Sequence, residues 1–257
     1  MAEVFKTPGV YIKEIPLFPP SIAEVETAIP AFIGYTERAT INGTDLTLKP
    51  TRISSLLEYE TMFGTAQKEN AITITITDSV DSGVIVSRTI VANSDVLRRS
   101  RFKMYYSLQM FFANGGGPCY IVSTGTYENN SITVDYADTD IDQAALGNGL
   151  TEIAKFDEPT LLIFPDATAL SNSDYNALFG DALSQCADLK DRFTIIDVKP
   201  VTLVNTIEDS MNDFRNAQLM ESTIDKLKYG AAYFPFIETA LKYRSDPTDV
   251  IVVYQTI

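Results

Sequence analysis

Strand-length apolar runs alternate with helical stripes through the second half of the chain, and this order constrains the fold more than any other feature. Buried strands are predicted at 160–165, 193–198 and 229–234, and apolar residues at helical spacing precede them in 142–155, 171–189 and 207–224. Ser171 and Asp174 resemble a capping box at the start of the second helix. Because helices between successive strands favour parallel pairing, we predict an α/β core with a mainly parallel sheet over 131–257.

The spacing of the apolar residues is different between residues 71 and 92, where they recur at every second position. Three isoleucines alternate with threonines from Ile72 to Thr77, and Asp81-Ser82-Gly83 then provides a turn before Val84. A period of two on either side of a glycine turn predicts a β-hairpin. Exposed flat strands of this kind tend to aggregate, so the hairpin is expected to pair or pack in an assembly. The alternative is an insertion that decorates the surface.

The first 30 residues predict an extended arm. Thr7-Pro8-Gly9 signals a turn, and prolines at 16, 19, 20 and 30 disfavour a helix. The arm's apolar residues are expected to pack on its own body or on the sheet edge of a neighbour. The residues expected to make this contact are Val10, Tyr11, Ile12 and Ile15.

Residues 31–130 predict a mixed α/β region that contains the hairpin. It begins with a buried strand at 31–35, and a short helix follows Ser54-Ser55. A second helix, a tight turn and a strand are expected between Tyr105 and Tyr127. The turn residues are Asn114, Gly115, Gly116 and Gly117.

The residue types in the chain exclude most common catalytic sites. There is no histidine, which removes Ser-His-Asp and Cys-His nucleophiles and HExxH zinc sites. No Walker A loop is present, and the acidic stretch 138–149 lacks the glycine and glutamate of a calcium loop. Cys119 and Cys186 are too few for a disulfide framework, and Cys186 falls on a helical apolar stripe as a buried thiol. We therefore predict no enzyme activity, and no catalytic, cofactor-binding or metal-binding residues.

The charge balance argues against nucleic acid as a partner. The chain carries 34 acidic and 20 basic side chains, a formal net charge of −14. Its one dense basic cluster, expected to meet an acidic protein surface, comprises Arg98, Arg99, Arg101 and Lys103. The start lacks the apolar region of a secretory signal, and the uncharged stretch 105–127 is broken by the glycine turn. We predict a soluble protein of the cytoplasm with no membrane insertion.

Five segments of this sequence resemble segments of one known protein family. They occur in the same order and at similar spacing as in that family, over nearly the whole chain. They are TPGVYIKEIP at 7–16, PPSIAEVETAIPAFIGYT at 19–36, FFANGGGPCYIV at 111–122, DRFTIID at 191–197 and YGAAYFPF at 229–236. Together these segments resemble the tail sheath proteins of contractile phage tails and related contractile injection systems.

This resemblance implies a structural role. Sheath subunits stack as rings into a helical homo-oligomer around an inner tube protein, between a baseplate and a cap. Terminal arms join the sheets of neighbouring subunits, and a baseplate signal releases an extended sheath into a contracted one through new inter-subunit contacts, with no nucleotide, metal or other cofactor. The resemblance thus implies assembly in the cytoplasm and a place in a phage tail or injection particle.

Family members continue into a C-terminal domain that contacts the inner tube, whereas this sequence stops at Ile257. A partial chain and a shortened paralogue are the two explanations. Two other functions stay open: a sheath-like adaptor or cap that does not contract, and an α/β enzyme acting through carboxylates. The enzyme hypothesis predicts a pocket at the strand ends near Pro165, Asp166 or Asp197.

Overall fold

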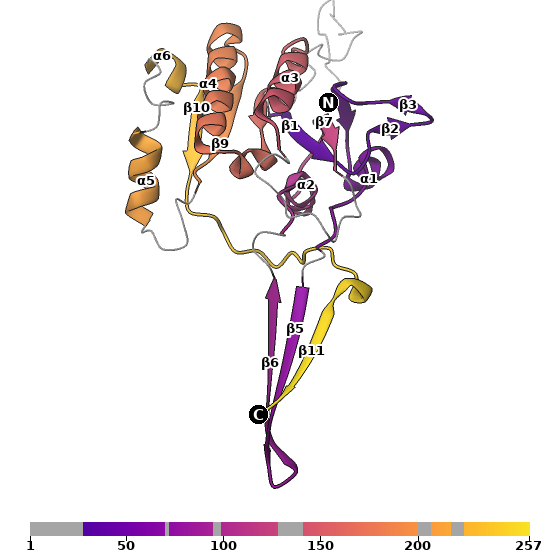
Figure 1. Cartoon of the computed structure of the whole chain (residues 1–257). Coiled ribbons are helices and arrows are strands. Elements are labelled where there is room, and N and C mark those ends of the chain that lie inside the picture. The colour runs from indigo at the N-terminus through magenta and orange to yellow at the C-terminus, as the bar shows by residue number, and fades with distance from the viewer. Residues whose placement is uncertain (1–27, 70–71, 95–98, 128–140, 200–206, 217–223) are drawn as a thin grey trace, which may run out of the picture.

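The computed structural model describes residues 28–69, 72–94, 99–127, 141–199, 207–216 and 224–257. These residues form a body around a six-stranded sheet and a three-stranded sheet that projects from it (Figure 1). The predicted arm residues Val10, Tyr11, Ile12 and Ile15, together with Arg98, lie outside the described residues.

The central sheet has the mainly parallel α/β architecture predicted from the sequence. Its strand order is β10-β9-β8-β1-β7-β4, and every neighbouring pair is parallel except β4 and β7. The bounds are β1 Pro30–Thr36, β4 Thr51–Ile53, β7 Cys119–Thr126, β8 Leu161–Ile163, β9 Phe193–Asp197 and β10 Gly230–Tyr233. The sheet crosses the predicted boundary at residue 130, because β1 and β7 come from one side of it and β8 to β10 from the other.

Helices cover both faces of this sheet. Side chains of β1 alternate between the two faces: Ala31 and Ile33 join the core under α3 (Gln143–Ile153) and α4 (Asn172–Leu189), while Phe32 joins the core under α1 (Leu56–Phe63) and α2 (Met104–Ala113). A central strand covered on both faces must be apolar throughout, which explains the run Ala31-Phe32-Ile33.

Local capping explains where several helices begin. The side chains of Ser55 and Ser171 accept hydrogen bonds from the backbone N–H groups of Glu58 and Asp174, and Asp142 accepts one from the N–H of Ala144. Cys186 is buried on α4, as its position in the apolar stripe predicts. Within the predicted helix 207–224 lie α5 (Ile207–Asn216) and α6 (Ile224–Leu227), and residues 217–223 fall outside the described residues.

The projecting sheet contains the predicted hairpin and one strand that the sequence analysis missed. β5 (Ile72–Asp81) and β6 (Val84–Ser94) are antiparallel, with Ser82 and Gly83 at positive φ in the turn. β11 (Ile251–Thr256) pairs parallel with β5 on its other edge. The assignment of all of 131–257 to the core is therefore wrong for β11, which leaves the body and lies beside the hairpin (Figure 1). A short hairpin, β2 (Thr40–Ile41) and β3 (Thr44–Asp45), completes the strands described.

A buried carboxylate joins three elements at the end of β1. The Oδ1 of Asp166 accepts hydrogen bonds from the backbone N–H of Lys103 at 2.6 Å and of Met104 at 3.2 Å, where α2 begins. Its Oδ2 accepts one from the N–H of Tyr35 at 2.8 Å. Asp166 itself lies in the 3-10 turn Pro165–Ala169 that follows β8, and its side chain is fully buried.

Glycine at position 34 makes this arrangement possible. A Cβ there would lie 2.4 Å from the Oδ2 of Asp166 and 2.9 Å from the Cε of Met104. The carboxylate is held by three hydrogen bonds, so it cannot move aside without losing them. Gly34 thus lets the 3-10 turn approach the backbone of β1 closely.

We expect Gly34→Ala to lower the free energy of unfolding by about 2 kcal/mol or more, because the methyl group would displace a hydrogen-bonded buried carboxylate. Urea denaturation followed by circular dichroism measures the change. Gly180→Ala in α4 is the matched control, since a Cβ there meets nothing within 4 Å. It should stabilise the protein by about 0.5–1 kcal/mol. Equal stabilities for the two variants would contradict the proposed role of Gly34.

Candidate assembly surface

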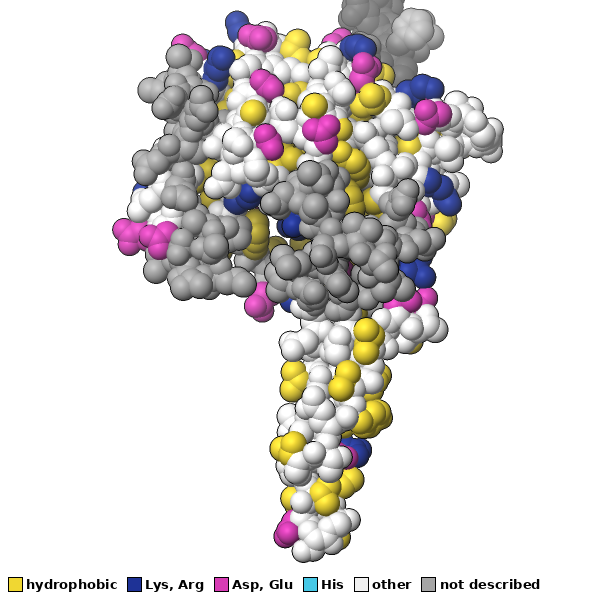
Figure 2. Space-filling model, in the orientation of Figure 1, with side chains coloured by type: hydrophobic (Ala, Val, Ile, Leu, Met, Phe, Trp, Pro, Cys, Tyr) yellow, Lys and Arg dark blue, Asp and Glu magenta, His cyan; other side chains and the backbone are white. Residues whose placement is uncertain are grey.

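The projecting sheet exposes an apolar face. Residues paired across neighbouring strands share a face, so the register groups the side chains directly. We call the first group the isoleucine face; it consists of Ile72, Ile74, Ile76, Ile90, Ala92, Val252 and Tyr254. Ile90 is 62% exposed and Tyr254 is 71% exposed, and Figure 2 shows hydrophobic side chains along the visible side of the projection.

The opposite face is more polar. We call it the threonine face; it consists of Thr73, Thr75, Thr77, Thr89, Val91, Asn93, Ile251, Val253 and Gln255. A sheet with one apolar and one polar face normally packs its apolar face against another layer. Among the described residues no helix or sheet covers the isoleucine face, since Ile90, Val252 and Tyr254 are all exposed.

The outer edge of β6 is also open to pairing. Within the described part of the chain, β6 pairs only with β5. The one charged residue of β6 is Arg88. It forms a bidentate ion pair with Asp78 on β5, in which both N–O distances are 2.7 Å. Natural proteins usually block long edge strands with prolines, lysines or bulges. Here the irregularity lies near the tip, between Ser79 and Val80, and leaves most of β6 regular.

A connecting segment, residues 234–250, joins the two sheets. Figure 1 shows it running from β10 across the lower end of the body to β11. Arg244 holds this segment against the body. Its backbone N–H donates to the Tyr106 hydroxyl at 2.8 Å. Its guanidinium donates to the Ala66 carbonyl at 2.8 Å and to the Thr65 hydroxyl. The carbonyl of Arg244 in turn accepts from the N–H of Glu69 at 2.7 Å.

Two further contacts hold this segment to the body. Lys68 and Asp246 form an ion pair at 3.0 Å, and the hydroxyl and backbone N–H of Thr248 also donate to Asp246, so the pKa of that carboxyl is held well below its usual range. The rings of Tyr106 and Tyr243 meet edge to face with centroids 5.0 Å apart. The projecting sheet is therefore fixed to the body through β11 as well as through the base of the hairpin.

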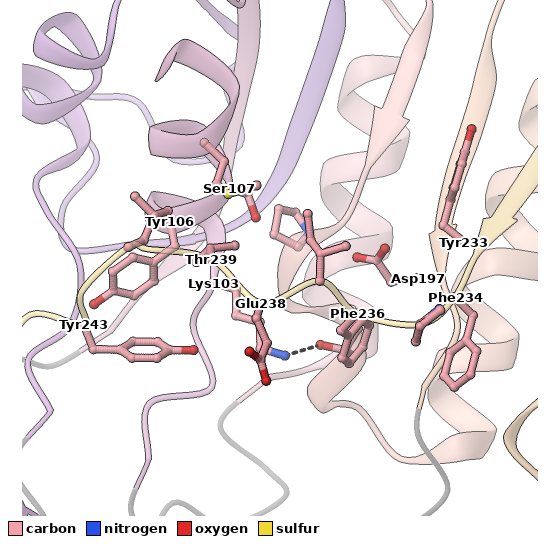
Figure 3. A pocket seen from close by; sticks show the side chains of 16 residues that line it. Lys103, Tyr106, Ser107, Asp197, Tyr233, Phe234, Phe236, Glu238, Thr239 and Tyr243 are labelled. Carbon is pink, nitrogen blue, oxygen red and sulfur yellow. Dashed lines mark hydrogen bonds between the residues drawn. The ribbon is translucent and has the colours of Figure 1, made fainter. Parts of the chain in front are cut away.

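A pocket of about 870 Å³ lies between the connecting segment and the carboxyl ends of β8, β9 and β10. Figure 3 shows aromatic side chains from the segment and from α2 on its walls, with Lys103 and Asp197 reaching into it. Pro165 and Asp197 line this pocket, and Asp166 is buried beside it, so it lies where the enzyme hypothesis places one.

Lys103 and Asp197 are two ionisable residues that line this pocket. The Lys103 amine donates to the Thr168 hydroxyl at 2.7 Å and lies 5.7 Å from the centroid of the Phe236 ring. Burial lowers the pKa of Lys103, although the carboxylates of Asp166 and Asp197 oppose the shift. Burial raises the pKa of Asp197, and Lys103 opposes that shift. These two groups can bind a polar or charged ligand.

The structure does not bring the predicted basic cluster together. Lys103 lies at the start of α2 and turns into the pocket, because its backbone N–H is held by Asp166. The Arg99 guanidinium donates to the Ser94 hydroxyl at 2.7 Å at the base of β6, and Arg101 is half-buried. Lys103 therefore lines the pocket, whereas the expectation that this cluster meets an acidic protein surface stays a prediction.

The predicted glycine turn lies between α2 and β7. α2 ends at Ala113, Asn114 caps it, and Gly115 has a φ of 82°. Gly116 packs against the Phe111 ring, and a Cβ there would lie 2.5 Å from it. Asn114, Gly115 and Gly116 thus have a structural role, whereas a Cβ at Gly117 would meet nothing within 4 Å.

The described residues offer neither a metal-binding cluster nor a membrane-spanning helix. They contain no group of three or more histidine, cysteine or acidic residues that could hold a metal ion. Within the same part of the chain, no helix has both the length and the apolar character needed to cross a membrane. No protein-family model matches the chain, and a search of curated proteins also gives no match.

The carboxyl of Asp166 should make stability depend on pH. Burial raises its pKa to about 6, although three backbone N–H donors and Lys103 favour its charged form. A raised pKa means that its contribution to stability is complete below the unfolded value of about 4 and is lost as pH rises through about 6. We expect the destabilisation caused by Asp166→Asn to be largest near pH 4 and to shrink by about 3 kcal/mol by pH 7. Urea titrations across this range test it.

Asp188→Asn, an exposed position on α4, controls for the loss of one negative charge. Its effect should stay nearly constant over the same range. A destabilisation by Asp166→Asn that does not change with pH would show that Asp166 keeps an ordinary pKa.

Arg244 should control how firmly β11 is held. We expect Arg244→Ala to speed amide hydrogen exchange at Glu69 and along β11 by about tenfold, because a charged hydrogen bond to a carbonyl contributes about 1.5–3 kcal/mol locally. Lys242→Ala, an exposed position in the same segment, should leave exchange within about twofold of wild type. Equal exchange in the two variants would exclude Arg244 as the anchor.

Proposed function

We propose that this chain is a structural subunit of a contractile sheath, which assembles helically around an inner tube and drives its ejection by passing from an extended to a contracted state. One observation carries the proposal: an apolar three-stranded sheet is held outside the body and leaves its isoleucine face exposed. Exposed apolar patches of this kind are often sites of contact with another protein, and the subunits of an assembly need such sites.

The described parts of the segments behind the family resemblance occupy positions that build the fold and its edges. Residues 30–36 are the central strand β1, the 114–117 turn leads into β7, and residues 230–233 are the edge strand β10. Among the described residues of these segments, Asp197 is the one carboxylate that lines the pocket. This distribution favours a structural subunit over an enzyme, because a catalytic family shares its reacting groups first.

Strand addition offers a physical route to assembly. Among the described residues, β10 and β4 each pair on one side only, so both edges of the central sheet carry unpaired backbone groups. An arm containing Val10, Tyr11, Ile12 and Ile15 from a neighbouring copy would supply the missing strand. Contraction would then draw its free energy from contacts formed between subunits, without nucleotide, metal or other cofactor.

Two other functions follow from particular features. A sheath-like adaptor or cap would use the same edges for assembly without contracting. A carboxylate-dependent enzyme would use the pocket at the strand ends, with Asp197 as its acid or base. Lys103 and Asp197 both line that pocket, but the absence of a histidine anywhere in the sequence leaves them without an imidazole partner.

Negative-stain electron microscopy tests the proposal. The protein, expressed with its native neighbours, should form striated tubes or stacked rings, because open sheet edges and an arm allow each copy to join two others. Deletion of residues 1–20 should abolish the tubes and leave a folded monomer, as judged by an unchanged circular dichroism spectrum. Tubes formed by the truncated chain would disprove the arm's role.

The enzyme alternative has its own test. Asp197→Asn should leave tube formation unchanged, since Asp197 faces the pocket and not a sheet edge. A hydrolytic activity of the purified chain that this substitution abolishes would favour the enzyme over the sheath subunit.

A further inference from the structure

We propose that the pocket at the carboxyl ends of β8, β9 and β10 binds an aliphatic polyamine, a small organic cation with several ammonium groups on a hydrocarbon chain. The pocket combines an aromatic wall, two carboxylates without partners and a negative local charge. Polyamine binding goes beyond the sheath function and does not depend on it.

Five aromatic rings line the pocket (Figure 3). They belong to Tyr106 on α2, to Tyr233 at the end of β10, and to Phe234, Phe236 and Tyr243 on the connecting segment. Tyr233, Phe236 and Tyr243 are exposed, so a ligand can reach them. A cation over the face of an aromatic ring is attracted by the electrons of the ring. The Lys103 amine already takes such a position, 5.7 Å from the centroid of the Phe236 ring.

Two carboxylates of the pocket have no partner in the described part of the chain. Asp197 ends β9, and Glu238 lies on the connecting segment. The Asp197 backbone carbonyl accepts a hydrogen bond from the Tyr175 hydroxyl, but among the described residues neither carboxylate accepts one or forms an ion pair. Burial raises the pKa of Asp197, which shows that its carboxylate is only partly hydrated. A positively charged ligand would therefore stabilise it.

The charges of the pocket favour a cation over an anion. One basic residue, Lys103, and two acidic residues line it, a net charge of −1. The Lys103 amine donates to the Thr168 hydroxyl at 2.7 Å and is already attracted by the carboxylates of Asp166 and Asp197. An anion beside Lys103 would be repelled by these carboxylates. A cation is attracted to them and to a chain whose net charge is −14.

The size and position of the pocket fit a flexible ligand with more than one charge. Its volume of about 870 Å³ is in the range of small-molecule sites, and it lies where open α/β sheets bind their ligands. Asp197 comes from the sheet and Glu238 from the segment that crosses it, so ammonium groups at two points of one chain would pair with the two carboxylates. The methylene groups between them would pack on the aromatic rings.

Titration of the full chain with spermidine, followed by isothermal calorimetry, tests the proposal. We expect saturable binding of one spermidine per chain, and about tenfold weaker binding by Asp197→Asn, which removes a charged hydrogen-bond acceptor. Asp188→Asn removes an exposed carboxylate on α4 and should weaken binding less than about twofold. Equal weakening by the two substitutions would show that spermidine binds the acidic surface in general, and would overturn the proposal.

The aromatic wall has a separate test. Phe236→Leu should weaken spermidine binding about threefold, because it removes a ring face from the pocket. Tyr254→Leu removes an exposed ring on the projecting sheet and should leave the affinity unchanged. Magnesium chloride titrated in place of spermidine should give no binding that Phe236→Leu weakens, since a hydrated inorganic ion has no hydrocarbon to pack on the rings. Equal affinities of wild type and Phe236→Leu for spermidine would contradict a role for the aromatic wall.

Lys103→Met tests the sign of the ligand's charge. The substitution removes the one cation that lines the pocket, so spermidine should bind about threefold more tightly. If spermidine does not bind, whereas 3-phenylpropionate binds and loses affinity in Lys103→Met, the pocket takes an organic anion and the proposal is wrong. An unchanged circular dichroism spectrum shows that the variant folds, and if it does not, the comparison of Asp197→Asn with Asp188→Asn still decides.

The sheath proposal is judged by a different measurement. Striated tubes from a chain that binds no spermidine would overturn the polyamine site and keep the sheath. Spermidine binding that depends on Asp197, in a preparation without tubes, would support the site and count against the sheath.

Discussion

The carboxylate of Asp166 is the interaction on which the arrangement of the body depends. It satisfies the first N–H groups of α2 and the N–H of Tyr35, and so ties a helix, the central strand and the turn after β8 together. A negative charge at a helix N-terminus is favourable, which offsets part of the cost of burying it. The close approach is possible because residue 34 has no side chain. α2 therefore lies across β1 with Met104 and Leu108 in the core.

The same contact determines what the pocket can and cannot do. With its backbone held by Asp166, Lys103 directs its amine toward Thr168 and Phe236, and so this member of the basic stretch lines the pocket. The connecting segment then closes one side of the space left at the strand ends. The pocket is thus a gap between a sheet and the segment that crosses it. This origin explains why aromatic and aliphatic side chains together form most of its wall.

The sequence predicted the body better than the attachment of the projecting sheet. The stripe from Tyr175 to Cys186 and the capping residue Ser171 define α4 locally, so periodicity alone could find it. The parallel pairing of β5 with β11 joins residues about 180 positions apart, and no local pattern encodes it. The run Ile251-Val252-Val253-Tyr254 was nevertheless a strand signal that could have been recognised. Lys103 was misassigned because a charge cluster in sequence does not show which member faces inward.

Stability and assembly place opposite demands on the two sheets. The central sheet is covered on both faces, so its apolar residues are already used for folding. The projecting sheet has no second layer among the described residues, and it is held by backbone pairing, by the Asp78–Arg88 ion pair and by the connecting segment. Its apolar face therefore contributes little to the fold of the body and stays exposed. Under the proposed sheath function, this face would be available for contact with another subunit, while the charge of the chain lies mostly on the body.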